Sequence, residues 1–131
     1  MKTPECLLAY AEELEQYYAR HYPPLAPLAK PCFLSTVQTT MEPLPGGETF
    51  VITGDIPAMW LRDSSAQVKN YLPFAAKDEQ VRSLLRGVIA TQVKDVLIDA
   101  YANAFNREAN GKGFQDKRIP KSIPARQSTR K

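Results

Sequence analysis

The sequence predicts a mainly α-helical fold with one small β-hairpin. In residues 4–22 and 78–101, apolar side chains recur at three- and four-residue steps, which is the spacing of one face of an amphipathic helix. In residues 36–52, apolar and β-branched residues flank a segment rich in proline and glycine, which is typical of a hairpin. The length of 131 residues suits one folding unit.

The first helix is predicted from Pro4 to Tyr22. Proline is tolerated in the first turn of a helix, and the prolines at 23 and 24 are expected to stop this one. Further prolines follow up to Pro31, and each removes a backbone N–H donor and restricts the residue before it. We therefore expect residues 23–31 to form a stiff, extended connector and no helix.

The hairpin is expected to pair residues 36–42 with residues 49–52 across the turn at 43–47. A short helix is predicted next, from Ser64 to Phe74. Ser64 and Gln67 have the spacing of a capping box, which marks the start of a helix, and Pro73 is expected to end it.

A longer helix is predicted from Asp78, a favourable N-cap residue, to about Tyr101. Its apolar positions form a face broad enough to need partners on more than one side. These positions are Val81, Leu84, Leu85, Val88, Ile89, Val93, Val96 and Leu97.

The composition, with 44% hydrophobic and 24% charged residues, is that of a globular protein. No apolar run approaches the roughly 20 residues needed to cross a bilayer, and residues 1–6 lack a signal-peptide pattern. We therefore expect a cytoplasmic protein without a membrane partner. Cys6 and Cys32 are too few for a disulfide framework or a zinc knuckle. His21 is expected at a helix C-terminus, where a cation is favourable, and not at a ligand site.

The net charge of +3 is distributed unevenly along the chain. Of the 17 basic residues, 6 lie after residue 116 with no acid among them, which leaves 11 against 14 acids and a charge of about −3 for residues 1–116. Helical periodicity is lost after Asn110, so this tail is expected to be disordered. Its basic residues are Lys117, Arg118, Lys121, Arg126, Arg130 and Lys131.

The segment 54–64 concentrates the side chains best suited to recognise a ligand. It contains Asp55, Trp60, Arg62 and Asp63, and Trp60 is the only tryptophan of the chain. Sugar recognition uses carboxylates that accept hydroxyl protons, a guanidinium fork that donates, and an aromatic face that covers the apolar side of the ring. If Ser64 is the N-cap of the following helix, the Asp63 carboxylate is free to meet a ligand.

Residue types alone favour a structural interpretation of the same segment. In this interpretation Asp63 is the helix cap, Arg62 pairs with Asp55, and Trp60 anchors the core. A second polar and aromatic cluster, residues 99–106 with Asn103 at its centre, is likewise interpreted more simply as a helix C-terminus, because asparagine tolerates left-handed backbone geometry. On residue types alone, the structural interpretation is therefore favoured over ligand binding for both clusters.

The segment from Thr49 to Ser64, TFVITGDIPAMWLRDS, resembles the signature of glycoside hydrolase family 125. The resemblance continues through residues 71–74 and 101–106 and covers about residues 5–112. Members of this family are metal-independent, exo-acting α-mannosidases, so the resemblance implies no metal and no cofactor. It also implies an (α/α)6 barrel, of which this chain would be an incomplete part.

The resemblance further implies hydrolysis of α-1,6-linked mannose from the non-reducing end of a mannose-containing glycan, with inversion. Inversion uses a general acid and a general base, with carboxyl groups about 6.5–9.5 Å apart. Arg62 and Asp63 after Trp60 are similar to an Arg-Asp pair that lies in the terminal-sugar pocket of related (α/α)6 glycosidases. Substrate binding is therefore carried onto these three residues and, at two further matching motif positions, onto Asp55 and Asn103. No catalytic residue is assigned.

The sequence departs from the family pattern in two places. Ala100 stands where proline is expected, and after Gly113 a basic tail replaces the expected acidic, tryptophan-containing continuation. We expect residues 1–113 to be the N-terminal portion of the catalytic domain and residues 114–131 to be a tail outside the family, produced by a frameshift or premature termination. The acid and base of the family fall beyond this portion, so the chain alone is expected to be inactive.

A different hypothesis makes the chain a small helical binding protein whose basic tail contacts nucleic acid. Six positive charges can engage phosphates with salt-sensitive affinity. The tail has no aromatic residue after Phe114 to stack on bases, so nucleic acid is ranked well below a glycan as the partner.

Overall fold

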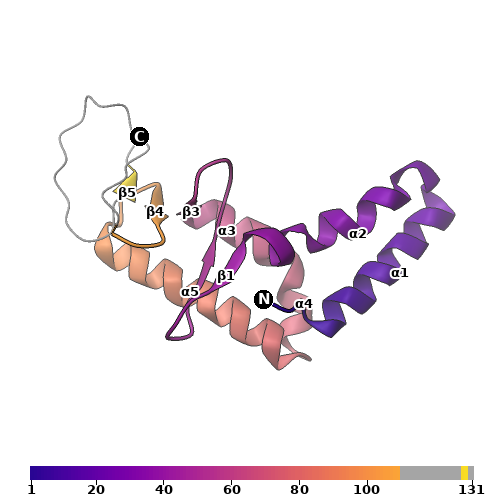
Figure 1. The fold of residues 1–131 in the computed structure, drawn as a ribbon, viewed down its shortest axis with the longest axis horizontal. Coiled ribbons are helices and arrows are strands. Elements are labelled where there is room, and N and C mark those ends of the chain that lie inside the picture. The colour runs from indigo at the N-terminus through magenta and orange to yellow at the C-terminus, as the bar shows by residue number, and fades with distance from the viewer. Residues whose placement is uncertain (110–127, 130–131) are drawn as a thin grey trace.

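The computed structural model describes residues 1–109 and 128–129, which are mainly helical with two small sheets. In Figure 1, α1 and α2 lie side by side as an arm, while α5 runs along the opposite part of the molecule beside the strands. The predicted fold class is confirmed. The main elements are α1 (Glu5–His21), α2 (Ala26–Ser35), β1 (Met41–Pro43), β2 (Thr49–Val51), β3 (Ala58–Trp60), α3 (Leu61–Val68), α4 (Leu72–Ala75), α5 (Glu79–Ile98), β4 (Ala104–Asn106) and β5 (Ser128–Thr129).

The α1 helix has the predicted bounds to within one residue, and His21 is its last residue, as expected. The prediction of an extended connector after it is wrong. A 3-10 turn at Pro23–Leu25 leads directly into α2, which contains Pro31 in its interior. Pro27 lies in the first turn, where an N–H has no helical partner, and Pro31 removes only one hydrogen bond.

Packing between α1 and α2 offsets that loss. The rings of Tyr10 and Phe33 lie 5.1 Å apart between centroids, and Lys30 forms an ion pair with Glu12. The sequence does not show these contacts, because they join residues 18 and more positions apart.

The predicted hairpin is present, with β1 antiparallel to β2 and Glu42 opposite Phe50. Its first strand is shorter than expected, because Thr36–Thr40 form one π-helical turn. The hydroxyl groups of Thr39 and Thr40 donate to carbonyl oxygens four residues back, at 2.7 and 2.9 Å, which ties these residues to the helix before them.

A second sheet, which was not predicted, pairs β3 with β4 and β4 with β5, all antiparallel. The register places Trp60 opposite Ala104 and Ala58 opposite Asn106. Strands of two or three residues are too short for a visible alternation of apolar and polar residues. The partners of β3 are more than 40 positions away in sequence, so no local pattern indicates the pairing.

The predicted capping box at Ser64 is wrong. The α3 helix begins at Leu61, and Ser64 is a fully buried helical residue whose hydroxyl donates to the Leu61 carbonyl oxygen at 3.0 Å. Pro73 does not end this helix either, because α3 gives way to a 3-10 turn at Lys69–Tyr71 and Pro73 lies in the first turn of α4.

The α5 helix confirms Asp78 as its N-cap, since the Asp78 carboxylate accepts the Val81 N–H at 2.9 Å. The helix ends at Ile98, three residues before the predicted end. Only the N-terminal half of its apolar face is covered: Val81, Leu84, Leu85 and Val88 are buried, whereas Ile89, Val93, Val96 and Leu97 are 44 to 81% exposed.

The core joins buried side chains of α5, the hairpin, β3 and α3 with others from α1 and α2 of the arm, and Tyr71 belongs to it. The Tyr71 hydroxyl donates to the Phe33 carbonyl oxygen at 2.7 Å and accepts the Val37 N–H at 3.3 Å. Among the described residues, both cysteines are free thiols and no helix is long and apolar enough to cross a membrane. Apart from residues 128 and 129, the predicted tail at 114–131 lies outside the described residues, so its boundary, its disorder and its contact with nucleic acid stay predictions.

Candidate functional site

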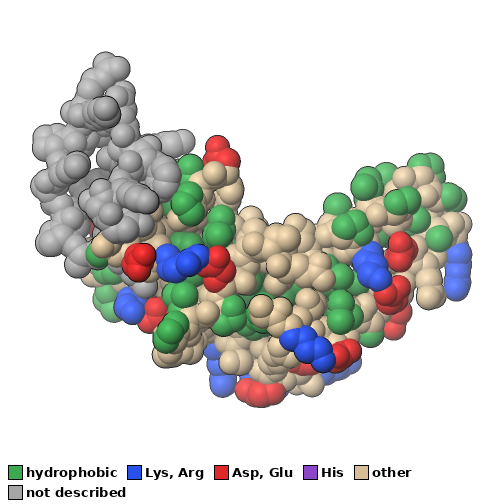
Figure 2. Space-filling model, viewed as in Figure 1, with side chains coloured by type: hydrophobic (Ala, Val, Ile, Leu, Met, Phe, Trp, Pro, Cys, Tyr) green, Lys and Arg blue, Asp and Glu red, His purple; other side chains and the backbone are tan. Residues whose placement is uncertain are grey.

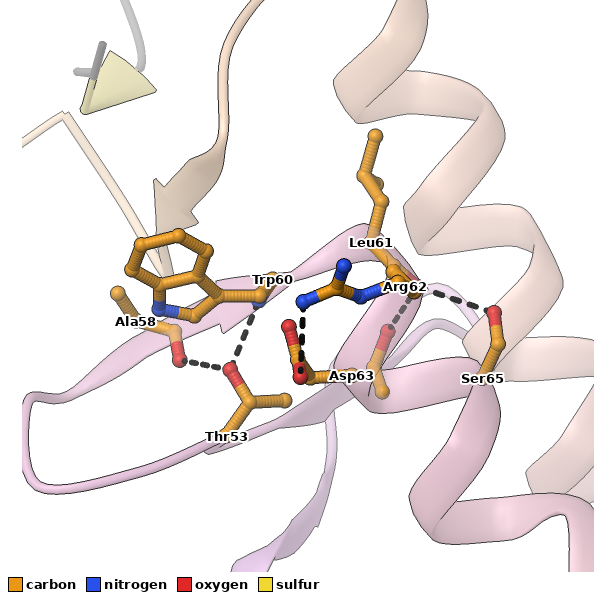
Figure 3. Close-up of polar contacts among 8 residues, drawn as sticks. Thr53, Ala58, Trp60, Leu61, Arg62, Asp63 and Ser65 are labelled. Carbon is orange, nitrogen blue, oxygen red and sulfur yellow. Dashed lines mark hydrogen bonds and ion pairs between the residues drawn. The ribbon is translucent and has the colours of Figure 1, made fainter. Parts of the chain in front are cut away.

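The segment between β2 and α3 is closed by Thr53. The Thr53 hydroxyl donates to the Ala58 carbonyl oxygen at 3.1 Å and accepts the Trp60 N–H at 2.8 Å (Figure 3). The Thr53 backbone N–H also donates to the Ala58 carbonyl oxygen, at 3.1 Å. Gly54 follows with φ +152°, a conformation that other residues rarely adopt, so the chain turns sharply there. These contacts fix the strand that ends in Trp60.

Trp60, Arg62 and Asp63 lie at one strand-to-helix junction. Trp60 is the half-buried last residue of β3, and the other two occupy the first turn of α3. The Arg62 side chain is 92% exposed and that of Asp63 is 42% exposed, with 3.9 Å between the guanidinium and the carboxylate. Figure 3 shows the Arg62 and Asp63 side chains on the side of α3 away from Ser65.

The two other predicted site residues are placed differently. Asp55 is exposed in the loop that Thr53 closes. Asn103 is half-buried and directly precedes β4, and the β3–β4 register places it one position beyond the residue opposite Trp60. The structure thus brings the 99–106 cluster beside the junction, although 43 positions separate Trp60 from Asn103.

The structural interpretation of this segment is wrong about the role of Asp63 and about the ion-pair partner of Arg62. Asp63 is not the helix cap, because the N-cap position belongs to Trp60 and has no side-chain hydrogen bond. The ion pair that Arg62 makes is with Asp63 and not with the expected Asp55. Trp60 is half-buried, whereas Met59 beside it is fully buried in the core.

The junction is suited to binding hydroxyl groups. An ion pair at 3.9 Å between exposed groups contributes little to stability, so both groups can exchange it for ligand contacts. Arginine donates from a rigid fork, aspartate accepts hydroxyl protons, and a half-buried indole offers an apolar face. Over residues 1–109 and 128–129, His, Cys, Asp and Glu side chains do not gather in threes as metal ligands would.

Sequence reasoning missed the residues that hold this junction in place. Thr53 lies inside the motif, but its type gives no sign that it bridges Ala58 and Trp60. Gln92 on α5 donates to Leu61, Ser64 and Ser65 of α3, and a glutamine in the middle of a long helix carries no local signal of such a role.

A shallow groove of about 330 Å³ lies beside the junction, between α3 and α5. Its walls are mostly apolar, because the exposed half of α5 forms one side. Figure 2 shows apolar side chains at the surface in several places, and a concave outline between the arm and the strands. The groove is lined by Leu61, Ser65, Gln92, Val93, Val96 and Leu97.

Comparisons with known proteins agree with the resemblance seen in the motif. Residues 23–128 match the model of the metal-independent α-mannosidases, glycoside hydrolase family 125. A solved structure of such a mannosidase from Streptococcus pneumoniae, in a non-productive complex with α-1,6-mannobiose, is 42% identical, with a TM-score of 0.77 over 85% of this chain and 26% of that chain. The Meiotically up-regulated gene 157 protein of Schizosaccharomyces pombe is 37% identical over 77% of this chain and 22% of its own length.

The chain therefore belongs to glycoside hydrolase family 125. It spans about a quarter of the length of these two relatives, and its helices and hairpin correspond to part of the mannosidase structure. The family match extends to residue 128, and the predicted boundary at residue 113 stays a prediction.

Proposed function

We propose that this chain supplies part of the mannose-holding wall of an inverting exo-α-1,6-mannosidase that acts on non-reducing terminal mannose of glycans. The observation that carries the proposal is the placement of Trp60, Arg62 and Asp63 at one junction, with the two charged side chains exposed on the same side of α3. The capture of the similar Streptococcus pneumoniae mannosidase with α-1,6-mannobiose supports this linkage as the one to test.

Each residue has a role that follows from its chemistry. The Arg62 fork donates to sugar hydroxyl oxygens, and the Asp63 carboxylate accepts hydroxyl protons from the same ring. The Trp60 indole covers the apolar face of the sugar. Asp55 and Asn103 are proposed as further contacts, from the exposed loop and from the start of β4.

We also propose that the 131-residue chain alone does not hydrolyse its substrate. Inverting hydrolysis requires an acid and a base on opposite sides of the scissile bond. The chain corresponds to 26% of the mannosidase structure that it matches. Apolar side chains are exposed along the C-terminal half of α5. This exposure supports the proposal, because further polypeptide would cover such a face in a whole enzyme.

Titration with α-1,6-mannobiose, followed by the fluorescence of the single tryptophan, tests the binding proposal. Wild type is expected to respond with saturation. Arg62→Met and Asp63→Asn are expected to weaken binding at least about ten-fold, since hydrogen bonds to charged groups contribute roughly 1.5–3 kcal/mol. Arg20→Met, on an exposed arginine at the far end of α1, is the matched control and should leave binding unchanged.

A wild-type chain whose Trp60 fluorescence does not respond to mannobiose would contradict the binding proposal. Release of mannose above background by the isolated chain would contradict the proposal of inactivity. The two results are separable, because binding is measured without turnover.

A further inference from the structure

The side chain of Gln92 on α5 is hydrogen-bonded to the first turn of α3. The Gln92 amide nitrogen lies 2.8 Å from the Ser64 hydroxyl oxygen, 2.8 Å from the Ser65 hydroxyl oxygen and 3.2 Å from the Leu61 carbonyl oxygen. These contacts join residues 27 to 31 positions apart, so they fix two helices relative to each other.

The directions of these hydrogen bonds are mutually consistent. Both serine hydroxyl groups donate to the Leu61 carbonyl oxygen, each at 3.0 Å. Each hydroxyl proton is therefore used, and the lone pairs of both oxygens remain to accept the two amide protons of Gln92. The longer contact of the same nitrogen, 3.2 Å to the Leu61 carbonyl oxygen, shares one of these protons. The result is a closed network of four residues in which every donor has an acceptor.

The network contacts one face of α3 and leaves the opposite face free of these hydrogen bonds. Leu61, Ser64 and Ser65 are at positions i, i+3 and i+4, which share one side of a helix. Arg62 and Asp63 fall between them in sequence and so lie on the other side, as Figure 3 shows. Gln92 thus contacts the turn that carries both charged side chains, on the face opposite to them.

Helix geometry alone would not fix this turn. The N-cap of α3 has no side-chain hydrogen bond, so the capping that usually fixes the start of a helix is missing. The bonds from Gln92 reach the same turn from a neighbouring helix, and α5 is itself anchored by its Asp78 cap and by its packing on the hairpin.

We propose that Gln92 is a positioning residue for sugar binding, which orients Arg62 and Asp63 by fixing the first turn of α3 on α5. The inference rests on the proposed function for the ligand, but the orientation of the turn can be measured without a sugar. A polar side chain with this role is distinguishable from one that only stabilises the fold.

The test compares Gln92→Leu and Gln92→Glu with wild type. Leucine removes the amide, and glutamate keeps the length but has no N–H to donate to the Ser64 and Ser65 hydroxyl oxygens or to the Leu61 carbonyl oxygen. Gln80→Leu is the matched control, because Gln80 is on the same helix and its amide also donates to a backbone carbonyl oxygen, that of Lys2 at 3.0 Å, away from the junction.

Three measurements are made on each full-length variant: α-1,6-mannobiose affinity from Trp60 fluorescence, amide hydrogen exchange at residues 61–65, and the NMR resonances of the Trp60 indole and the Arg62 Nε. Both Gln92 variants are expected to bind mannobiose about ten-fold more weakly, to exchange faster at residues 61–65 and to shift both resonances, at a melting temperature close to that of Gln80→Leu.

Wild-type exchange and resonances in Gln92→Leu would overturn the proposal, whatever the affinity. If wild type itself fails to bind mannobiose, the proposed function fails and the exchange and resonance data still decide the role of Gln92. If Gln92→Leu does not fold, Ser65→Ala, which removes one exposed member of the network, takes its place and is expected to show the same changes at smaller size. Unchanged exchange in Ser65→Ala would then be the overturning result.

Discussion

Replacing Gly87 by alanine is expected to destabilise this protein, although alanine is the better helix former. Gly87 lies in the middle of α5, where the helix passes directly over the hairpin. A Cβ atom at this position would lie 2.3 Å from the Thr49 hydroxyl oxygen, 2.8 Å from the Gly47 carbonyl oxygen and 2.9 Å from the Thr49 backbone nitrogen. Ordinary contacts between such atoms are about 3.5–4.0 Å.

The size of the destabilisation follows from the atoms that an added Cβ would displace. The Thr49 hydroxyl can rotate, but two of the three contacts are with backbone, so β2 and its turn must shift away from α5. Overpacking of this kind costs about 1–3 kcal/mol. The shift also strains the hydrogen bond from Thr91 to the Thr49 carbonyl oxygen, 3.0 Å long and worth about 0.5–1.5 kcal/mol. Alanine returns about 1 kcal/mol through helix propensity, which leaves a net loss of about 0.5–3.5 kcal/mol.

Thermal unfolding followed by circular dichroism measures the effect. At about 4 °C per kcal/mol, Gly87→Ala is expected to melt roughly 2–14 °C below wild type. Ser83→Ala, at an exposed position of the same helix, is the control and should stay within about 0.5 kcal/mol of wild type. A Gly87→Ala protein that melts at or above the wild-type temperature would refute the close packing of α5 on the hairpin.

Three further predictions concern the α5 helix and the thiols. Hydrogen bonds from the Val81 N–H and then from the Cys6 thiol lower the pKa of Asp78 in the folded protein. The Asp78 carboxylate therefore stabilises the folded state fully above its unfolded pKa of about 3.9, and this contribution is lost as the pH falls through the folded pKa. Asp78→Asn should make the melting temperature fall less steeply below about pH 5. Burial and then the Asp78 carboxylate raise the pKa of Cys6 from 9.0 to about 11, so iodoacetamide at pH 8 should alkylate the exposed Cys32 first, and equal rates by peptide mass spectrometry would contradict this. Leu97, 81% exposed, should promote self-association, and Leu97→Lys should lower light scattering without lowering the melting temperature.

The sequence indicated the long helices and the hairpin because their signals are local. The apolar stripe of α1 and the cap of α5 are set by side chains within one or two turns of each other. The prediction failed at α2 and at the start of α3, where local signals pointed the wrong way. Prolines argued against a helix that packing on α1 stabilises, and a capping pattern at Ser64 suggested a helix start that pairing of β3 with β4 moves to Leu61.

The candidate site shows the same division between local and long-range information. The motif alone identified Asp55, Trp60, Arg62 and Asp63 as a group, and its resemblance identified the family. Residue types could not say whether Asp63 capped the helix, because that depends on where the helix begins. Only the folded chain shows that α3 begins after Trp60, that its N-cap has no side-chain hydrogen bond, and that Arg62 and Asp63 point away from Ser65.

By itself, the sequence determined the helical class, the glycoside hydrolase family and the candidate residues of the motif, because each is encoded in a continuous stretch of chain. The tertiary structure alone decided that Asn103 lies beside the junction and that Gln92 is hydrogen-bonded to its first turn. Both depend on contacts between residues about 30 or more positions apart, which form only when α5 and β4 pack against the segment that carries Arg62 and Asp63. Which half of the α5 face is buried was likewise decided by the helices and strands that the fold places against it.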